Sequence, residues 1–310
     1  MQYIHINDVP RPLSRLALGC TLFSAGSEEQ AHSVLDRFVE RGGNTFDTAH
    51  IYGGGAYERA LGKWLAERGN RDQSVIIGKG CHPIGNSGPR VIPEHIHSDI
   101  NDSLERLQID VIDLYLLHRD DENVPVGPLV EALNEERERG RIRAFGGSNW
   151  RHARLAEAQG YADAQGLVGF AASSPNLSLA RPKEPMWAGC VSVDADEHAW
   201  YAQTQMPLIS WSSQAGGFFT GRYSPQDTSN ADMVRVYYSE RNFARLERAK
   251  QLAADKEVAA LQIALAWVIN QPFPVVALIG PQNIAELDSS LTADGIHLSA
   301  EELDFLDQAE

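Results

Sequence analysis

Cysteine is scarce in this chain of 310 residues, which contains only Cys20, Cys81 and Cys190. Three widely separated cysteines without metal-ligand spacing predict neither a disulfide framework nor a metal site, and we expect buried thiols in a reducing compartment. Basic residues are also few, because 27 lysines and arginines stand against 42 aspartates and glutamates, for a formal net charge of −15. This acidic excess argues against nucleic acid or an anionic membrane as a partner and favours a small-molecule ligand.

Long apolar runs are missing as well. No segment approaches the length that spans a bilayer, and the first twenty residues lack the charged-then-apolar pattern of a secretion signal. The sequence therefore predicts a cytoplasmic location. The glycine-rich dinucleotide fingerprint, which would follow the first strand of an open doubly wound sheet, is absent after Leu18. This absence disfavours an open sheet.

Short apolar strands alternate with amphipathic helices along the whole chain. The expected strands are 13–19, 45–47, 75–79, 113–118, 144–148, 168–172, 208–211 and 275–279, after a short one at 3–6. The expected helices are 27–41, 57–68, 93–107, 126–139, 151–159, 198–205, one or two within 243–271, 284–291 and 300–308. Eight strand-helix units of this length predict an α/β fold, a single (β/α)8 TIM barrel domain over residues 1–310. Its longest loops are expected after the sixth and seventh strands.

Four polar residues follow or end three consecutive predicted strands. Asp47 and Tyr52 follow the second strand, Lys79 ends the third and His118 ends the fourth. Each alone has an ordinary structural explanation, as a loop cap or as a side chain satisfied in the core. Because the carboxyl ends of barrel strands converge on one face, the four together predict a catalytic site.

The chemistry of these four side chains is complementary. Asp47 would keep a buried Lys79 charged, and the ammonium would lower the pKa of Tyr52 towards the working pH. Tyr52 could then donate a proton to a carbonyl oxygen that neutral His118 orients. Since no nucleophile with a base and no metal site accompanies them, we expect a bound cofactor to supply the remaining chemistry. Hydride delivery pairs naturally with proton donation.

Several motifs occur in a characteristic order: FDTAHIYG with the following Glu58, the strand-end Lys79, LLHRD, and GGSNW at 146–150. With them the chain resembles the aldo-keto reductase family. The resemblance implies a barrel that binds NADPH or NADH without a Rossmann motif and reversibly reduces a small aldehyde or ketone, sugar-like or other. It also implies that Asp47, Tyr52, Lys79 and His118 form a catalytic tetrad with Tyr52 as proton donor.

The resemblance assigns further residues to the cofactor. Ser148 and Asn149 match a pair that holds the nicotinamide carboxamide, Ser173 and Ser174 replace two amides in the next segment, and Trp211 matches an aromatic ring stacked on the nicotinamide. The residues expected at the pyrophosphate are Ser212, Gln214, Gly216, Phe218, Gly221 and Arg222. Those expected at the adenosine are Gly280, Gln282, Asn283, Glu286 and Ser290.

The adenosine segment departs from the family pattern in its charge. Residues 280–291 contain no lysine or arginine, and Glu286 stands where relatives that prefer NADPH carry arginine or glutamine. A carboxylate would repel a 2′-phosphate and could accept hydrogen bonds from a free ribose diol. We therefore expect NADH to serve at least as well as NADPH. The alternative, with Glu286 in solvent and a distant arginine at the phosphate, stays open.

The substrate side is less specific. Phe23, His82 and Trp150 are expected to line the pocket, with Trp187 as a further candidate, and segments 180–195 and 222–241 to cover it. Two other functions stay open. One is a cofactor-binding, redox-sensing regulatory subunit like the family's channel-associated members. The other is a lyase or isomerase using Lys79 as a Schiff base, which Asp47 disfavours. The oligomeric state is not predicted.

Overall fold

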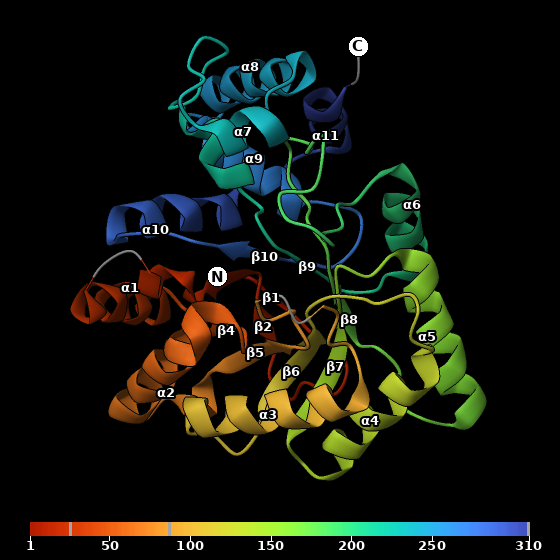
Figure 1. Cartoon of the computed structure of the whole chain (residues 1–310). Coiled ribbons are helices and arrows are strands. Elements are labelled where there is room, and N and C mark those ends of the chain that lie inside the picture. The colour runs from red at the N-terminus through yellow and green to blue at the C-terminus, as the bar shows by residue number, and fades with distance from the viewer. Residues whose placement is uncertain (25–26, 86–87, 309–310) are drawn as a thin grey trace.

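A computed structural model of the chain describes residues 1–24, 27–85 and 88–308 (Figure 1). Its parallel strands close into a barrel in the order β10-β3-β4-β5-β6-β7-β8-β9. They are β3 (Leu16–Gly19), β4 (Thr45–Asp47), β5 (Val75–Gly80), β6 (Ile112–Leu117), β7 (Ile142–Ser148), β8 (Ala172–Ser174), β9 (Leu208–Ser210) and β10 (Val275–Ile279). A short antiparallel pair, β1 (Tyr3–Ile4) and β2 (Leu13–Ser14), precedes them. The predicted (β/α)8 barrel is confirmed.

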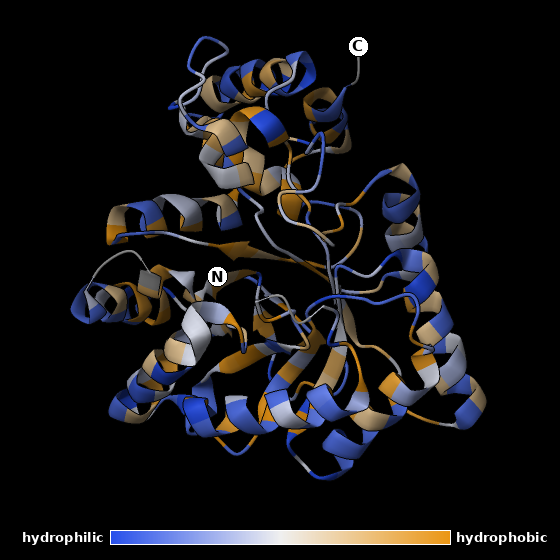
Figure 2. Cartoon of the chain, in the orientation of Figure 1, coloured by the Kyte–Doolittle hydropathy of each residue, from blue (hydrophilic) through white to orange (hydrophobic). Residues whose placement is uncertain are grey.

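The helices surround the strands and turn their hydrophilic residues outward (Figures 1 and 2). They are α1 (Glu28–Glu40), α2 (Ala56–Arg68), α3 (Pro93–Leu107), α4 (Val126–Glu138), α5 (His152–Gln165), α6 (Ala195–Thr204), α7 (Ala231–Val236), α8 (Glu240–Asp255), α9 (Ala260–Ile269), α10 (Ile284–Leu291) and α11 (Ala300–Asp307). Among the residues that the structure describes, no helix has both the length and the apolar character needed to cross a bilayer.

Several elements differ in their bounds from the sequence prediction, and three differences are explained by local structure. The sixth barrel strand is 172–174 rather than 168–172, because Val168 is still in the preceding loop, where its N–H donates to the side chain of Asn134. Helix α5 continues past Gln159 to Gln165, and the following Gly166, with a left-handed φ of 66°, caps it. The loop expected over 222–241 contains the short helix α7.

The interior of the barrel explains why polar side chains gather at one end. Side chains alternate along each strand, so Ile76 packs outward against the helices while Val75 and Ile77 point into the barrel. The inner core also includes Leu114 and Leu116 of β6 and is covered by Ile6, Val9 and Leu13 of the N-terminal segment. The next inward positions on these strands are polar, and they form the candidate site.

Candidate active site

Strand register brings the predicted catalytic residues together. Asp47 follows the outward-facing Phe46 and pairs in register with the inward-facing Ile77, and Lys79 lies two residues further along β5. His118 continues the inward series of β6, and its N–H donates to the carbonyl of Gly80 at 2.8 Å. Asp47, Lys79 and His118 thus continue the inward series at the carboxyl ends of three neighbouring strands.

The contacts among the four side chains are direct. Lys79 Nζ lies 2.5 Å from Asp47 Oδ1 and donates to the Thr48 carbonyl at 3.0 Å. The same ammonium lies 5.3 Å from the centre of the Tyr52 ring, and the rings of Tyr52 and His118 are 5.6 Å apart and nearly perpendicular. A phenol, an ammonium and an imidazole therefore converge at one point, which suits proton transfer to a bound carbonyl oxygen.

Glycines allow Tyr52 to approach this point. Tyr52 begins the 3-10 segment η2 (Tyr52–Gly55), whose Gly53, Gly54 and Gly55 have φ of 57°, 60° and 87°. Gly55 has a left-handed φ of 87°, and a Cβ there would lie 2.7 Å from the guanidinium of Arg106, so a side chain at this position would be strained. Gly55 therefore gives clearance between the Tyr52 loop and the Arg106 side chain of helix α3.

Burial and neighbouring charges set the protonation states. Burial alone would lower the pKa of Lys79, but Asp47 and Tyr52 raise it above its usual value, so the ammonium stays charged. Burial raises the pKa of Tyr52, and this outweighs the lowering by Lys79. The sequence-based expectation of a net lowered pKa for Tyr52 is therefore wrong. The phenol keeps its proton across the neutral range, as a proton donor requires.

His118 makes the stability of the protein depend on pH. Burial, followed by Lys79 and Arg119, lowers the pKa of His118 well below 6.5. The unfolded chain takes up this proton below about pH 6.5 and the folded chain does not, so this contribution to stability is present above that pH and is lost as the pH falls.

The His118→Gln variant should therefore lose less stability than the wild type when the pH falls from about 7.5 to 5.5. The difference in the free energy of unfolding, measured with urea, should be up to about 1.4 kcal/mol per pH unit. Equal losses would contradict this.

The four residues lie at one end of a cavity of about 1790 Å³ at the carboxyl ends of the strands. Of the other predicted site residues, the following line it: His82, Ser148, Asn149, Trp211, Ser212, Gln214, Gly216, Gly221, Arg222, Gly280, Gln282, Glu286 and Ser290. Trp187, 58% exposed, also lines it, and its ring lies 6.1 Å from that of Trp211. One continuous space thus joins the candidate proton donor to segment 280–290.

Two of the expected substrate-pocket residues do not line this cavity. The ring of Trp150 is fully buried against Phe170, and its Nε1 donates to the carbonyl of Arg119 at 3.1 Å. Phe23 packs beside Tyr57 instead. Both side chains are taken up by packing behind the site, so a role in contacting substrate is not supported by their positions.

Four expected cofactor residues also do not line the cavity. Ser173 bonds the hydroxyl of Tyr201 at 2.7 Å, the fully buried Phe218 packs on Phe243, and Asn283 caps α10 by accepting from the Glu286 N–H. Ser174 is buried behind Ser148, whose Oγ donates to the Ser174 carbonyl at 2.9 Å. None of these four residues is among those that line the cavity.

Other cavity-lining residues were not predicted. Arg119 and Asp120 belong to the LLHRD motif, but their sequence neighbours give no sign that they face the cavity. Gly189 and Cys190 come from the loop after β8, and Lys250 comes from α8. Lys250 carried no recognisable signal, because only the tertiary fold brings the long helix α8 to the cavity.

The cavity suits a nucleotide in two respects. The indole Nε1 of Trp211 is buried without a hydrogen-bond partner among the residues described. Beyond it, Ser212 and Ala215 have left-handed φ of 49° and 48°, followed by Gly216, Gly217 and Gly221, also at positive φ. Such left-handed turns are typical of anion-binding loops, because they direct successive backbone N–H groups to one side. The segment therefore fits the pyrophosphate site predicted for it.

Comparison with known proteins decides the family. The sequence model of the Aldo/keto reductase family matches residues 15–310. The chain belongs to this family.

This aldo-keto reductase family member aligns with its relatives over nearly its whole length. It is 28% identical to the oxidoreductase YrpG of Bacillus subtilis, covering 99% of this chain and 95% of the relative. It is 26% identical to a probable voltage-gated potassium channel subunit beta of Arabidopsis thaliana, covering 94% and 91%. A solved glycerol dehydrogenase from Gluconobacter oxydans superposes with a TM-score of 0.81 over 98% of this chain and 94% of that one, and at 24% identity this likeness concerns the fold alone.

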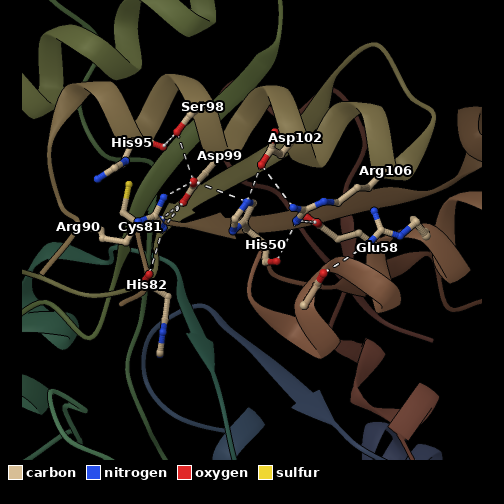
Figure 3. Close-up of polar contacts among 12 residues, drawn as sticks. His50, Glu58, Cys81, His82, Arg90, His95, Ser98, Asp99, Asp102 and Arg106 are labelled. Carbon is tan, nitrogen blue, oxygen red and sulfur yellow. Dashed lines mark hydrogen bonds and ion pairs between the residues drawn. The ribbon is translucent and has the colours of Figure 1, made fainter. Parts of the chain in front are cut away.

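A second polar cluster lies between helix α3 and the loops that follow β4 and β5 (Figure 3). The nearly fully buried Asp99 of α3 pairs with Arg90 at 2.7 Å and accepts from the N–H of Cys81, directly after β5. His50 stands between Asp47 and Tyr52 in the sequence. Its Nε2 lies 3.0 Å from Asp102 Oδ2 and 3.7 Å from Asp99 Oδ1. The cluster therefore ties the loops that follow β4 and β5 to one helix.

Loss of the Asp99 carboxylate should destabilise the protein strongly. Asp99→Ala would leave Arg90 buried without its partner, which typically costs about 3–5 kcal/mol. The matched control is Asp102→Ala on the same helix, whose side chain is 47% exposed and whose loss should cost no more than about 1 kcal/mol. Urea unfolding of both variants checks this, and equal losses would show that the buried pair has no special weight.

Proposed function

We propose that the protein is an NAD(P)H-dependent oxidoreductase that reversibly reduces an aldehyde or ketone to an alcohol. The observation that carries the proposal is the charged pair of Lys79 and Asp47 packed against Tyr52 and His118 at the end of a large cavity. Tyr52 holds the proton that a developing alkoxide would receive, and neutral His118 can hold the carbonyl oxygen in place. Lys79 stabilises the phenolate that remains.

A nicotinamide cofactor, when bound, supplies the hydride. We infer that Ser148, Asn149 and Trp211 hold its nicotinamide end. Asn149 is already fixed, since its Oδ1 accepts from the Val191 N–H at 3.1 Å and its Nδ2 donates to the His118 carbonyl at 3.2 Å. Segment 212–222 is suited to the pyrophosphate and segment 280–290 to the adenosine.

We expect NADH to be used at least as well as NADPH. The exposed Glu286 lines the cavity, and one of its oxygens accepts from the Gln282 N–H at 2.9 Å, which keeps the negative charge beside the adenosine segment. Lys250 lines the same cavity, but its Nζ lies 2.7 Å from Glu247. The check is kcat/KM with each cofactor for the wild type and for Glu286→Gln, which should move the ratio towards NADPH. A hundredfold wild-type preference for NADPH would contradict the idea.

A panel of aldehydes tests the proposed activity. With saturating NADH or NADPH, loss of absorbance at 340 nm should accompany the formation of alcohol.

A second candidate is a redox-sensing regulatory subunit, favoured by the similarity to a potassium channel subunit beta. Stopped-flow oxidation of the bound cofactor separates the two, because a sensor would oxidise it very slowly with every aldehyde.

A further inference from the structure

The arginines that line the cavity differ in what neutralises their charge. Arg90 lies 2.7 Å from Asp99. Arg222 and Arg119 have no carboxylate within 4.0 Å anywhere in residues 1–24, 27–85 and 88–308. Arg222 lies beside η4 (Ala215–Thr220), the segment suited to the cofactor's pyrophosphate, so its charge already has a proposed partner there. The charge of Arg119 has none.

Arg119 lies at the opposite end of the cavity, next to the proton donor. It directly follows His118, and its Nη1 donates to the His118 carbonyl at 2.9 Å. Its own carbonyl accepts from Trp150, and a Cβ built on Gly189 would lie 3.3 Å from its Cδ. The backbone and the aliphatic stem are therefore fixed between the end of β6 and the loop after β8. The Nε and Nη2 groups have no acceptor in the described part of the chain.

Nearby acidic groups do not offset this charge. Asp120 lines the cavity but lies 3.3 Å from Arg154, and Asp47 is paired with Lys79. The charge of Arg119 acts on the site. Burial is the largest cause of the lowered pKa values of His118 and His82, and Arg119 lowers both further. Arg119 also opposes the rise in the pKa of Tyr52 that burial causes. An arginine does not lose its proton in proteins, so a permanent positive charge faces the substrate end of the cavity.

We propose that the substrate of this reductase is an anionic carbonyl compound, whose carboxylate or phosphate group binds the Arg119 guanidinium while its carbonyl lies at Tyr52. The inference rests on the proposed function and specifies its substrate class. A guanidinium with free N–H groups on a fixed stem is suited to bind such a group through two parallel hydrogen bonds. The exposed aromatic ring of Trp187, which lines the same cavity, can cover the apolar part of this molecule.

Matched substrates that differ in the charge of one group, and otherwise only by a methyl, test the inference. We would compare 3- and 4-carboxybenzaldehyde with their methyl esters and take the ratio of kcat/KM for acid and ester. The wild type should favour at least one acid. Arg119→Met should lower that ratio about 10- to 100-fold, Arg119→Glu should bring it below one, and Arg119→Lys should retain part of the preference. Arg222→Met is the control, because it should change acid and ester alike and leave the ratio as it is.

The outcomes separate the inference from the proposed function. Turnover of both acid and ester with a ratio that Arg119→Met does not lower would overturn the inference and leave the reductase standing. If no aldehyde is turned over, the result would count against the proposed function itself. In that case, or if the variants do not fold, binding to the wild type with cofactor present decides. Benzoate should quench tryptophan fluorescence at lower concentration than benzamide, and equal affinity would overturn the inference.

Discussion

Replacing Tyr52 by phenylalanine should abolish carbonyl reduction while leaving cofactor binding nearly unchanged. The Tyr52 phenol keeps its proton in the neutral range and lies beside both Lys79 and His118. Removing a general acid typically lowers the rate about 10²- to 10⁴-fold. The aromatic ring stays, so the cavity keeps its shape. Steady-state kinetics measures the first effect, and quenching of tryptophan fluorescence by NADH or NADPH measures the second.

A matched control exists five residues further along the chain. Tyr57→Phe removes a hydroxyl from a ring that packs against Phe23, and Tyr57 does not line the cavity. We expect its kcat to stay within about twofold of the wild type, as for a substitution far from the reacting atoms. Substantial activity in Tyr52→Phe would exclude Tyr52 as the proton donor. Equal losses in both variants would indicate damage to the fold around η2 instead.

Strand periodicity made the barrel and the convergence of the site predictable. Asp47, Lys79 and His118 follow the inward positions of their strands by a period of two, which is visible in the sequence once the strands are recognised. The net pKa of Tyr52 was not predictable, because it depends on how deeply the ring is buried. Trp150 was misplaced for a related reason. Its ring folds back over Gly147, where a Cβ would lie 2.7 Å from Cγ, and no periodicity describes such a reversal.

The charges of Arg119 and Lys250 show a second limit. The sequence places Arg119 next to His118 but cannot tell which of the neighbouring aspartates it meets, and in the fold Asp120 pairs with Arg154. Lys250 reaches the cavity only through the packing of α8 against the barrel's helices. Pairing of charges and the approach of distant helices are tertiary properties, so the substrate preference can be argued only from the structure.

Replacing Lys79 by methionine should remove both activity and stability, for two separable reasons. Tyr52 would lose the cation that stabilises its phenolate, and we expect kcat to fall about 10²- to 10³-fold, as for loss of an electrostatic stabiliser. Asp47, which is 2% exposed, would remain buried without its partner, and breaking such a pair typically costs about 3–5 kcal/mol. Kinetics and urea unfolding measure the two effects independently.

A double variant distinguishes the two roles of the ion pair. Lys79→Met with Asp47→Asn removes both charges, so much of the lost stability should return, and a double-mutant cycle gives the coupling between the two groups. Activity should stay low, because the phenolate still has no cation. An active double variant would show that Lys79 serves only to neutralise Asp47.

The same lysine would be the nucleophile if the protein were a Schiff-base lyase or isomerase. Borohydride should then trap a carbonyl substrate on the wild type, whereas the ammonium paired with Asp47 at 2.5 Å leads us to expect no adduct.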